Sequence, residues 1–171
     1  PTGAAAATEP LAQSESTDAG VEFVRTSEEV RGYLLASTSM AVDGNTDAAA
    51  HLAAEPAEEH WAILGPALRE ANASLADSLQ ADLERLPAMA ENRSAAEYEQ
   101  FVRETVFPQL TAAETAVVGQ STAENATFNA KVVRDLHERT VHEYREGVSN
   151  GTVTDEAEYR VGQAFADRAE A

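Results

Sequence analysis

Residues 61–86, WAILGPALREANASLADSLQADLERL, hold the strongest apolar periodicity in the chain. Apolar side chains return every three or four residues, which is the spacing of one face of an α-helix. They are Trp61, Leu64, Leu68, Ala71, Leu75, Leu79, Leu83 and Leu86. This stripe predicts one long helix that buries its apolar face, with a bend at Gly65-Pro66 and an end at Pro87.

The segments around this stripe carry the start and stop signals of further helices. Thr26 or Ser27, followed by Glu28-Glu29, is typical of a helix N-cap, and Asp43-Gly44-Asn45 is typical of a helix end. The other predicted helices begin at Thr46-Asp47, with a kink or restart at Pro56; at Ser94, with a kink at Pro108; at Ala126, running to Val148; and after Thr154-Asp155. No segment alternates as a β-strand does, so the predicted fold class is all-α, an antiparallel helical bundle of about five helices.

Composition divides the chain into an N-terminal tail and one domain. Residues 1–20 are mainly Ala, Thr, Ser, Glu, Pro and Gly without periodicity, which is typical of a flexible linker or of a mature N-terminus behind a removed anchor. Residues 21–171 are predicted to form a single helical-bundle domain. Within it, Val30-Arg31 and Val133-Arg134 each open a segment that leads through a glycine turn into a second helix. Two helical hairpins related by duplication would explain this pattern, and so would ordinary helix capping.

The chain is strongly acidic. It has 30 acidic and 12 basic residues, a formal net charge of −18 at pH 7, and Lys131 as its only lysine. Such a composition resembles that of haloarchaeal proteins, in which molar salt shortens the Debye length to about 3 Å and screens the repulsion among carboxylates. We therefore expect a halophilic protein. The lack of a basic patch argues against a nucleic-acid partner, and no stretch approaches the roughly 20 apolar residues that direct membrane insertion requires.

Four Asn-x-Ser/Thr sequons indicate the compartment. They begin at Asn72, Asn92, Asn125 and Asn150, and three of them fall near predicted helix ends or turns, where a glycan can be carried. They favour a glycoprotein that is extracellular or on the cell surface. The chain contains no cysteine, which excludes disulfides and thiolate metal ligands.

All four histidines lie on two predicted helices. His51, Glu55 and Glu59 are spaced by four and can supply half of a His/carboxylate metal site, if the helix continues past Pro56. The competing interpretation is an acidic helix face that happens to contain a histidine.

The second pair, His137 and His142, is five residues apart. Their side chains therefore diverge by roughly 140°, and the pair does not match the zincin motif. The apolar stripe through Val133 and Val141 places His137 on the buried side, with Glu143 as the carboxylate that faces inward beside it. A hydrogen-bonded core histidine is the competing interpretation of His137.

The inward candidates are thus Met40 or His51, together with His60, His137 and Glu143. If they converge, they would form a small site suited to copper or iron. No motif for nucleophilic catalysis or phosphate binding is present, and paired carboxylates are too common in this chain to indicate hydrolase chemistry. The sequence therefore predicts a protein that is not an enzyme.

Two stretches carry a family resemblance. They are residues 25–34, RTSEEVRGYL, with Glu59-His60-Trp61, and residues 128–136, FNAKVVRDL, with residues 142–148, HEYREGV. Together they resemble a haloarchaeal secreted helical domain of unknown function that occurs beside halocyanin-type blue-copper domains, and the resemblance covers most of residues 21–171. It implies a blue-copper or other domain of the same parent protein as a partner. The arrangement of helical hairpins is also similar to the extracellular helical part of iron-permease-type proteins.

These observations predict a non-enzymatic extracellular module of a haloarchaeal envelope protein, accessory to copper or iron handling or to electron transfer. The alternative is a structural subunit of the cell surface, a spacer, adhesion or filament-type protein without a ligand site, which could form a homo-oligomer. The positions of His51, His60, His137 and Glu143 separate the two.

Overall fold

The computed structural model of the chain describes residues 9–170, and within them nearly every residue outside the turns is helical. The α-helices are α1 (Glu9–Val42), α2 (Thr46–Glu55), α3 (Trp61–Asn92), α4 (Ala95–Phe101), α5 (Phe107–Val118), α6 (Gln120–Ala123), α7 (Ala126–Gly147) and α8 (Glu156–Glu170). Two π-helical turns, η1 (Pro56–His60) and η2 (Val102–Val106), and a hairpin of strands β1 (Val148–Ser149) and β2 (Thr152–Val153) complete the described part. The predicted all-α class is confirmed.

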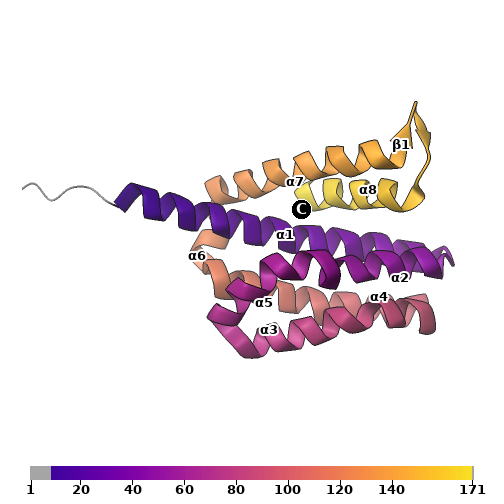
Figure 1. Cartoon of the computed structure of the whole chain (residues 1–171), viewed down its shortest axis with the longest axis horizontal. Coiled ribbons are helices and arrows are strands. Elements are labelled where there is room, and N and C mark those ends of the chain that lie inside the picture. Colours follow the sequence, from indigo (N-terminus) through magenta and orange to yellow (C-terminus); the bar gives the residue numbers. More distant parts are fainter. Residues whose placement is uncertain (1–8, 171) are drawn as a thin grey trace, which may run out of the picture.

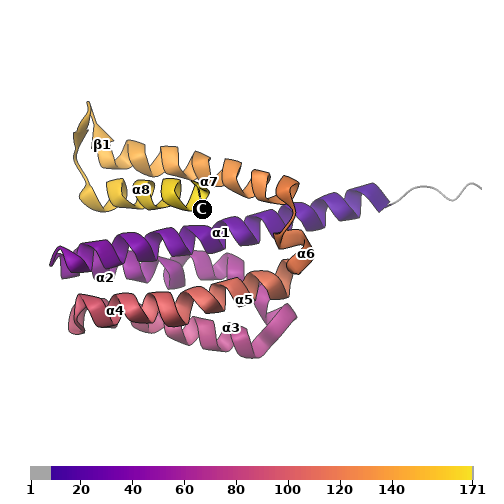
Figure 2. The same ribbon diagram turned by 180° about the vertical axis from the view of Figure 1, so that it is seen from behind.

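Helix α1 is the central element of the bundle. Figure 1 shows α1 running through the middle, with α7 and α8 on one side and α3, α4 and α5 on the other. The view from behind shows the same order, and α1 packs against α2, α3, α5, α7 and α8 (Figure 2). The α1–α2 and α7–α8 pairs are the two predicted helical hairpins, and their relation by duplication stays a prediction.

Helix α1 begins at Glu9, well before the start at Thr26 or Ser27 that the sequence predicts. The predicted N-cap is wrong, because Thr26 and Ser27 lie buried in the middle of this helix. The Ser27 hydroxyl donates a hydrogen bond of 2.6 Å to Glu114 of α5 and does not cap a helix end. Of the predicted linker, residues 1–8 lie outside the described residues, and residues 9–20 are helical.

The turn from α1 to α2 is the predicted one. Gly44 has a φ of +82°, a conformation that favours glycine, and the Asn45 backbone N–H donates to the Met40 carbonyl at 2.9 Å. The Asn45 side chain then accepts from the Ala48 N–H at 3.3 Å and caps α2. Local residue chemistry therefore determines this hairpin.

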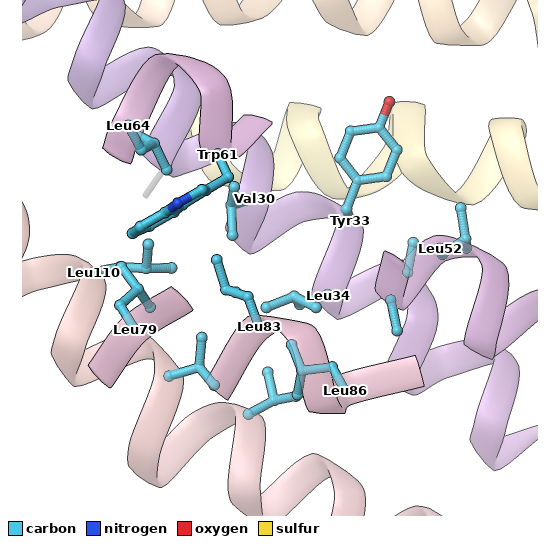
Figure 3. Packing of buried hydrophobic residues seen from close by; sticks show 14 of the residues in the cluster. Val30, Tyr33, Leu34, Leu52, Trp61, Leu64, Leu79, Leu83, Leu86 and Leu110 are labelled. Carbon is cyan, nitrogen blue, oxygen red and sulfur yellow. The ribbon is translucent and has the colours of Figure 1, made fainter. Parts of the chain in front are cut away.

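The apolar stripe of residues 61–86 lies in α3 and forms much of the core. Leu79, Leu83 and Leu86 pack against Val30 and Leu34 of α1 (Figure 3). The predicted long helix is nevertheless interrupted, and its non-helical residue is Asn72 and not the predicted bend at Gly65-Pro66. Asn72 has non-helical backbone angles, φ −157° and ψ 90°, and its side chain accepts from the Leu75 N–H at 3.1 Å, so it caps a second helical segment.

Pro87 does not end α3, which continues to Asn92. A proline inside a helix removes one backbone hydrogen bond and crowds the preceding turn. Leu86 and Ala90 on either side of it are buried, so we attribute the continuation to packing of this face against the core.

The predicted kinks at Pro56 and Pro108 appear as π-helical turns. The turn η1 starts at Pro56, and η2 ends just before Phe107-Pro108. A π-helical turn holds one extra residue, which relieves the clash between the proline ring and the preceding turn and changes where the following side chains point. His60 is the last residue of η1, and it is buried.

The α7–α8 connection is a β-hairpin that the sequence analysis did not predict. Asn150 and Gly151 both have positive φ, 51° and 75°, as a two-residue type I′ turn requires. The last residue of α7, Gly147, allows the two helices to approach closely. A Cβ on Gly147 would lie 2.5 Å from the backbone nitrogen of Tyr159.

Candidate metal centre

Charged side chains are buried where α1, η1, α7 and α8 meet. Glu29 of α1 is 3% exposed, His60 of η1 is 5% exposed and Glu143 of α7 is 3% exposed. A buried charged group costs free energy unless it is paired or binds a cation. The partners of these three residues therefore indicate what the site can do.

His60 is held in place from three directions. Its Nδ1 lies 3.2 Å from the Glu55 carbonyl oxygen, and its Nε2 lies 3.5 Å from Glu29 Oε2. Its ring packs edge-on against Tyr33, with 5.1 Å between ring centroids. Tyr33 lies at the margin of the leucine cluster with its hydroxyl directed away from it (Figure 3). His60 is therefore a fixed partner of Glu29.

Glu29 is the carboxylate of the site whose negative charge is compensated by neighbouring cations. It forms ion pairs with Arg25, one turn earlier on α1, and with Arg139 of α7, whose Nε lies 3.2 Å from Glu29 Oε1. Burial alone would raise the pKa of Glu29, but the hydrogen bond from His60 and the charges of Arg25 and Arg139 outweigh it and hold the pKa below its usual value. Glu29 is thus an ionised, fully paired group.

Glu143, in contrast to Glu29, lies among other carboxylates and has fewer cationic neighbours. Oxygen atoms of Glu143, Glu146 and Glu158 all lie within 4.8 Å of one another, and we call these three residues the Glu143 cluster. The one cation beside Glu143 among the described residues is Arg139, at 3.5 Å, and Glu29 shares it. Burial, and then a hydrogen bond and repulsion from Glu158, raise the pKa of Glu143 to about 8.

The cluster therefore holds a proton where a cation could bind. A pKa of about 8 means that the Glu143 carboxyl keeps its proton at neutral pH. Glu146 is exposed and Glu158 is half-buried, so the cluster opens to solvent on one side. Carboxylates from facing helices form the metal sites of many helical bundles, and a bound cation would replace both the proton and the repulsion.

Two of the four predicted ligands lie in this region. His60 and Glu143 are connected through Glu29 and Arg139, as the prediction of inward-facing side chains requires. His51 does not join them: its side chain is 71% exposed and its nearest carboxylate is Glu55, at 3.9 Å. The four predicted residues do not converge on one point.

The predicted burial of His137 is wrong, since this residue is exposed on the outer face of α7. The helix buries a different stripe, which runs through Phe128, Val132, Leu136, Glu143 and Gly147. Met40, the remaining candidate, is buried in the apolar core at 1% exposure.

Sequence reasoning missed Glu29, Glu146 and Glu158. Glu143 and Glu146 are three residues apart, which places them on the same side of a helix, and this spacing could have identified the pair. Among 30 acidic residues such a spacing has little specificity. The sequence predicts Glu29 at a helix start, where a carboxylate is solvated, whereas Glu29 lies in the middle of α1.

The four predicted glycosylation sites are all exposed. The side-chain oxygens of Asn72 and Asn125 accept backbone hydrogen bonds at helix starts, and the Asn92 side-chain nitrogen donates to the Ala88 carbonyl at 2.9 Å. Asn150 lies at the tip of the β-hairpin. Their glycosylation stays a prediction.

Among residues 9–170, none of the helices combines the length and the apolarity that a membrane span requires.

Comparison with known proteins connects the C-terminal third of the chain to a described family. The model of the iron permease-associated 4-helix bundle domain matches residues 119–171, which contain α6, α7 and α8 and the whole Glu143 cluster. This match agrees with the similarity to iron-permease-type proteins stated from the sequence. No curated protein and no solved structure matches the chain.

Proposed function

We propose that this chain is a non-enzymatic accessory domain that binds iron outside the cell and acts beside a membrane iron permease. The observation that carries the proposal is the Glu143 cluster. A buried carboxyl group faces two further carboxylates, and the one arginine beside it is shared with Glu29. The family match supports the same reading, because it includes all three carboxylates and names association with an iron permease.

The donor atoms favour iron over copper. Carboxylate oxygens suit ferric iron, a hard cation, and they cannot replace the thiolate and thioether ligands of an electron-transfer copper site; the family match to an iron permease-associated domain then points to iron. The chain has no cysteine, and Met40 lies in the apolar core. We therefore narrow the expected metal to iron, bound as cargo, and place any electron transfer in a neighbouring domain.

Each carboxylate has a distinct part in the proposed site. Glu143 is fixed by burial and by Arg139, and Glu158 approaches it from α8. Glu146, one turn after Glu143, is exposed and is the ligand through which iron enters and leaves. Glu29, which is held by His60, pairs with Arg139 and so connects this arginine to α1. Such an open site suits a domain that passes its cargo on.

The partner and the compartment are part of the same proposal. A permease needs iron delivered at the membrane surface, and a strongly acidic, glycosylated domain on the outside of a haloarchaeal cell would concentrate cations there. The exposed sequons support this location.

The second candidate is the structural subunit without a ligand. The exposed apolar side chains Val141 and Tyr144 on α7 favour it, because such side chains are typical of contact surfaces.

Iron titration distinguishes the two candidates. In molar potassium chloride under argon, ferrous iron is expected to bind the chain at one equivalent with micromolar or tighter affinity. Glu158→Gln should weaken this binding about tenfold or more, because the cluster loses one of its charged ligands. Glu70→Gln, which removes the same charge from an exposed site on α3, should leave it unchanged. Weak binding at many sites that Glu158→Gln does not alter would favour the structural subunit.

A further inference from the structure

We propose that two copies of this chain pair antiparallel along the outer faces of their α7 helices, around a two-fold axis at Val141. This face is apolar although it is exposed. Val141 is 48% exposed and Tyr144 is 51% exposed, whereas most large apolar residues of the described chain are buried. The inference is independent of iron binding.

An open groove runs along this face of α7. This shallow depression is lined by Ala130, Val133, His137 and Val141 together with arginine and glutamate side chains. All of the residues that line it belong to α7, so within residues 18–170 no second helix covers it. Its apolar spacing is that of a buried stripe, and for this reason the sequence predicts that this face lies in the core.

The groove also interrupts the acidic surface. Arg134 and Arg145 border it with a single acidic residue, Glu138, in a chain that has 30 acidic and 12 basic residues. Arg145 takes part in no ion pair within the described chain, and neither does Glu138. Two unpaired groups of opposite charge beside an apolar stripe are what a self-complementary contact requires.

Helix geometry brings these groups together in a two-fold pair. Glu138 and Arg145 are seven residues apart and therefore lie on the same side of α7, with Val141 between them. An antiparallel copy related by an axis through Val141 places Glu138 beside Arg145 of the second copy, and the symmetry repeats this ion pair. His137 and Tyr144 have the same spacing on the other side of Val141, so they also meet across the axis.

The same arrangement explains why the second copy is the preferred occupant. An acidic partner would repel Glu138. A basic partner would repel Arg134 and Arg145. A second α7 pairs Glu138 with Arg145 on both sides of the axis and covers both Val141 side chains. High salt, which this acidic chain is expected to need, screens the repulsion between copies and strengthens apolar contact.

Sedimentation in molar potassium chloride tests the pairing. The metal-free chain is expected to form a dimer, and Val141→Asp should raise its dissociation constant about tenfold or more, because two carboxylates would meet at the axis. Val42→Asp, at a position 64% exposed on α1, is the matched control and should leave the dimer intact. Glu138→Arg should weaken the dimer, and adding Arg145→Glu to it should restore the association.

A crosslinking experiment gives a second, independent readout. The chain has no cysteine, so Val141→Cys introduces a single thiol that the axis brings next to its copy. Mild oxidation should convert this variant to a covalent dimer, and the Val42→Cys control should stay monomeric. A monomeric wild-type chain at all concentrations, or a dimer that survives Val141→Asp and does not crosslink at Val141→Cys, would overturn the inference.

Discussion

Transfer of the chain from molar potassium chloride into dilute buffer is expected to unfold it. The net charge is −18, and the Debye length grows from about 3 Å at 1 M to about 30 Å at 0.01 M salt. Carboxylates across the whole surface then repel one another, and their repulsion favours the expanded chain. The helical circular dichroism signal should be lost at low salt and should return when salt is restored.

A charge-reduced variant controls for effects of salt other than screening. Glu70→Gln, Asp77→Asn and Glu91→Gln, combined, remove three exposed carboxylates of α3 that take part in no ion pair among the described residues. This variant should unfold at a lower salt concentration than the wild type. An unchanged melting temperature in dilute buffer would contradict the expectation of a halophilic protein.

Replacement of Glu143 by glutamine is expected to stabilise the metal-free chain above neutral pH. The pKa of Glu143 is about 8 in the folded chain, above its usual value of 4.5. Between pH 4.5 and pH 8, Glu143 has lost its proton in the unfolded chain but keeps it in the folded chain. The free energy of unfolding therefore falls as pH rises. The loss grows by at most about 1.4 kcal/mol per pH unit and is complete above the folded pKa.

Thermal melts at pH 5.5 and pH 8.5 in molar salt measure this effect. Glu143→Gln cannot ionise, so its stability should fall less between the two pH values than that of the wild type, by on the order of 3 kcal/mol. Glu70→Gln should follow the wild type. The same pH dependence in Glu143→Gln and in the wild type would show that Glu143 does not hold a buried proton.

The helix ends that the sequence predicts correctly depend on local chemistry. Gly44 ends α1 because its positive φ favours glycine, and Ser94 starts α4 through a capping box with Glu97. Asp155 likewise accepts from the Ala157 N–H at 2.9 Å at the start of α8. Each of these capping signals involves residues that are close together in the sequence. They can therefore be recognised without knowledge of the tertiary structure.

The predictions that were wrong concern positions where tertiary contacts outweigh the local signal. Ser27 and Glu28 have the spacing of a helix start, but Ser27 bonds to Glu114, 87 residues away, and Glu28 pairs with Arg168 of α8. Asn72 breaks α3 although the leucines on both sides keep their spacing, so the apolar pattern conceals the break.

The candidate site was only half predictable for the same reason. Helix α7 carries two apolar stripes, one through Val132 and Leu136 and one through Val133 and Val141. Contacts with α1 and α8 bury the first, and this choice places Glu143 inside and leaves His137 on the surface. The sequence pattern alone cannot show which of two stripes of similar apolarity faces the core.

The number of protons released when iron binds tests the central claim, that the Glu143 cluster is the iron site. Calorimetric titration of ferrous iron at pH 6.5, under argon and in two buffers of different ionisation enthalpy, gives that number. The account predicts one equivalent of iron and about one released proton, because iron displaces the proton that Glu143 holds below its pKa of about 8. Glu143→Gln should release none and bind at least about tenfold more weakly. Tight binding of iron without proton release, unchanged in Glu143→Gln, would place the metal elsewhere and contradict the account.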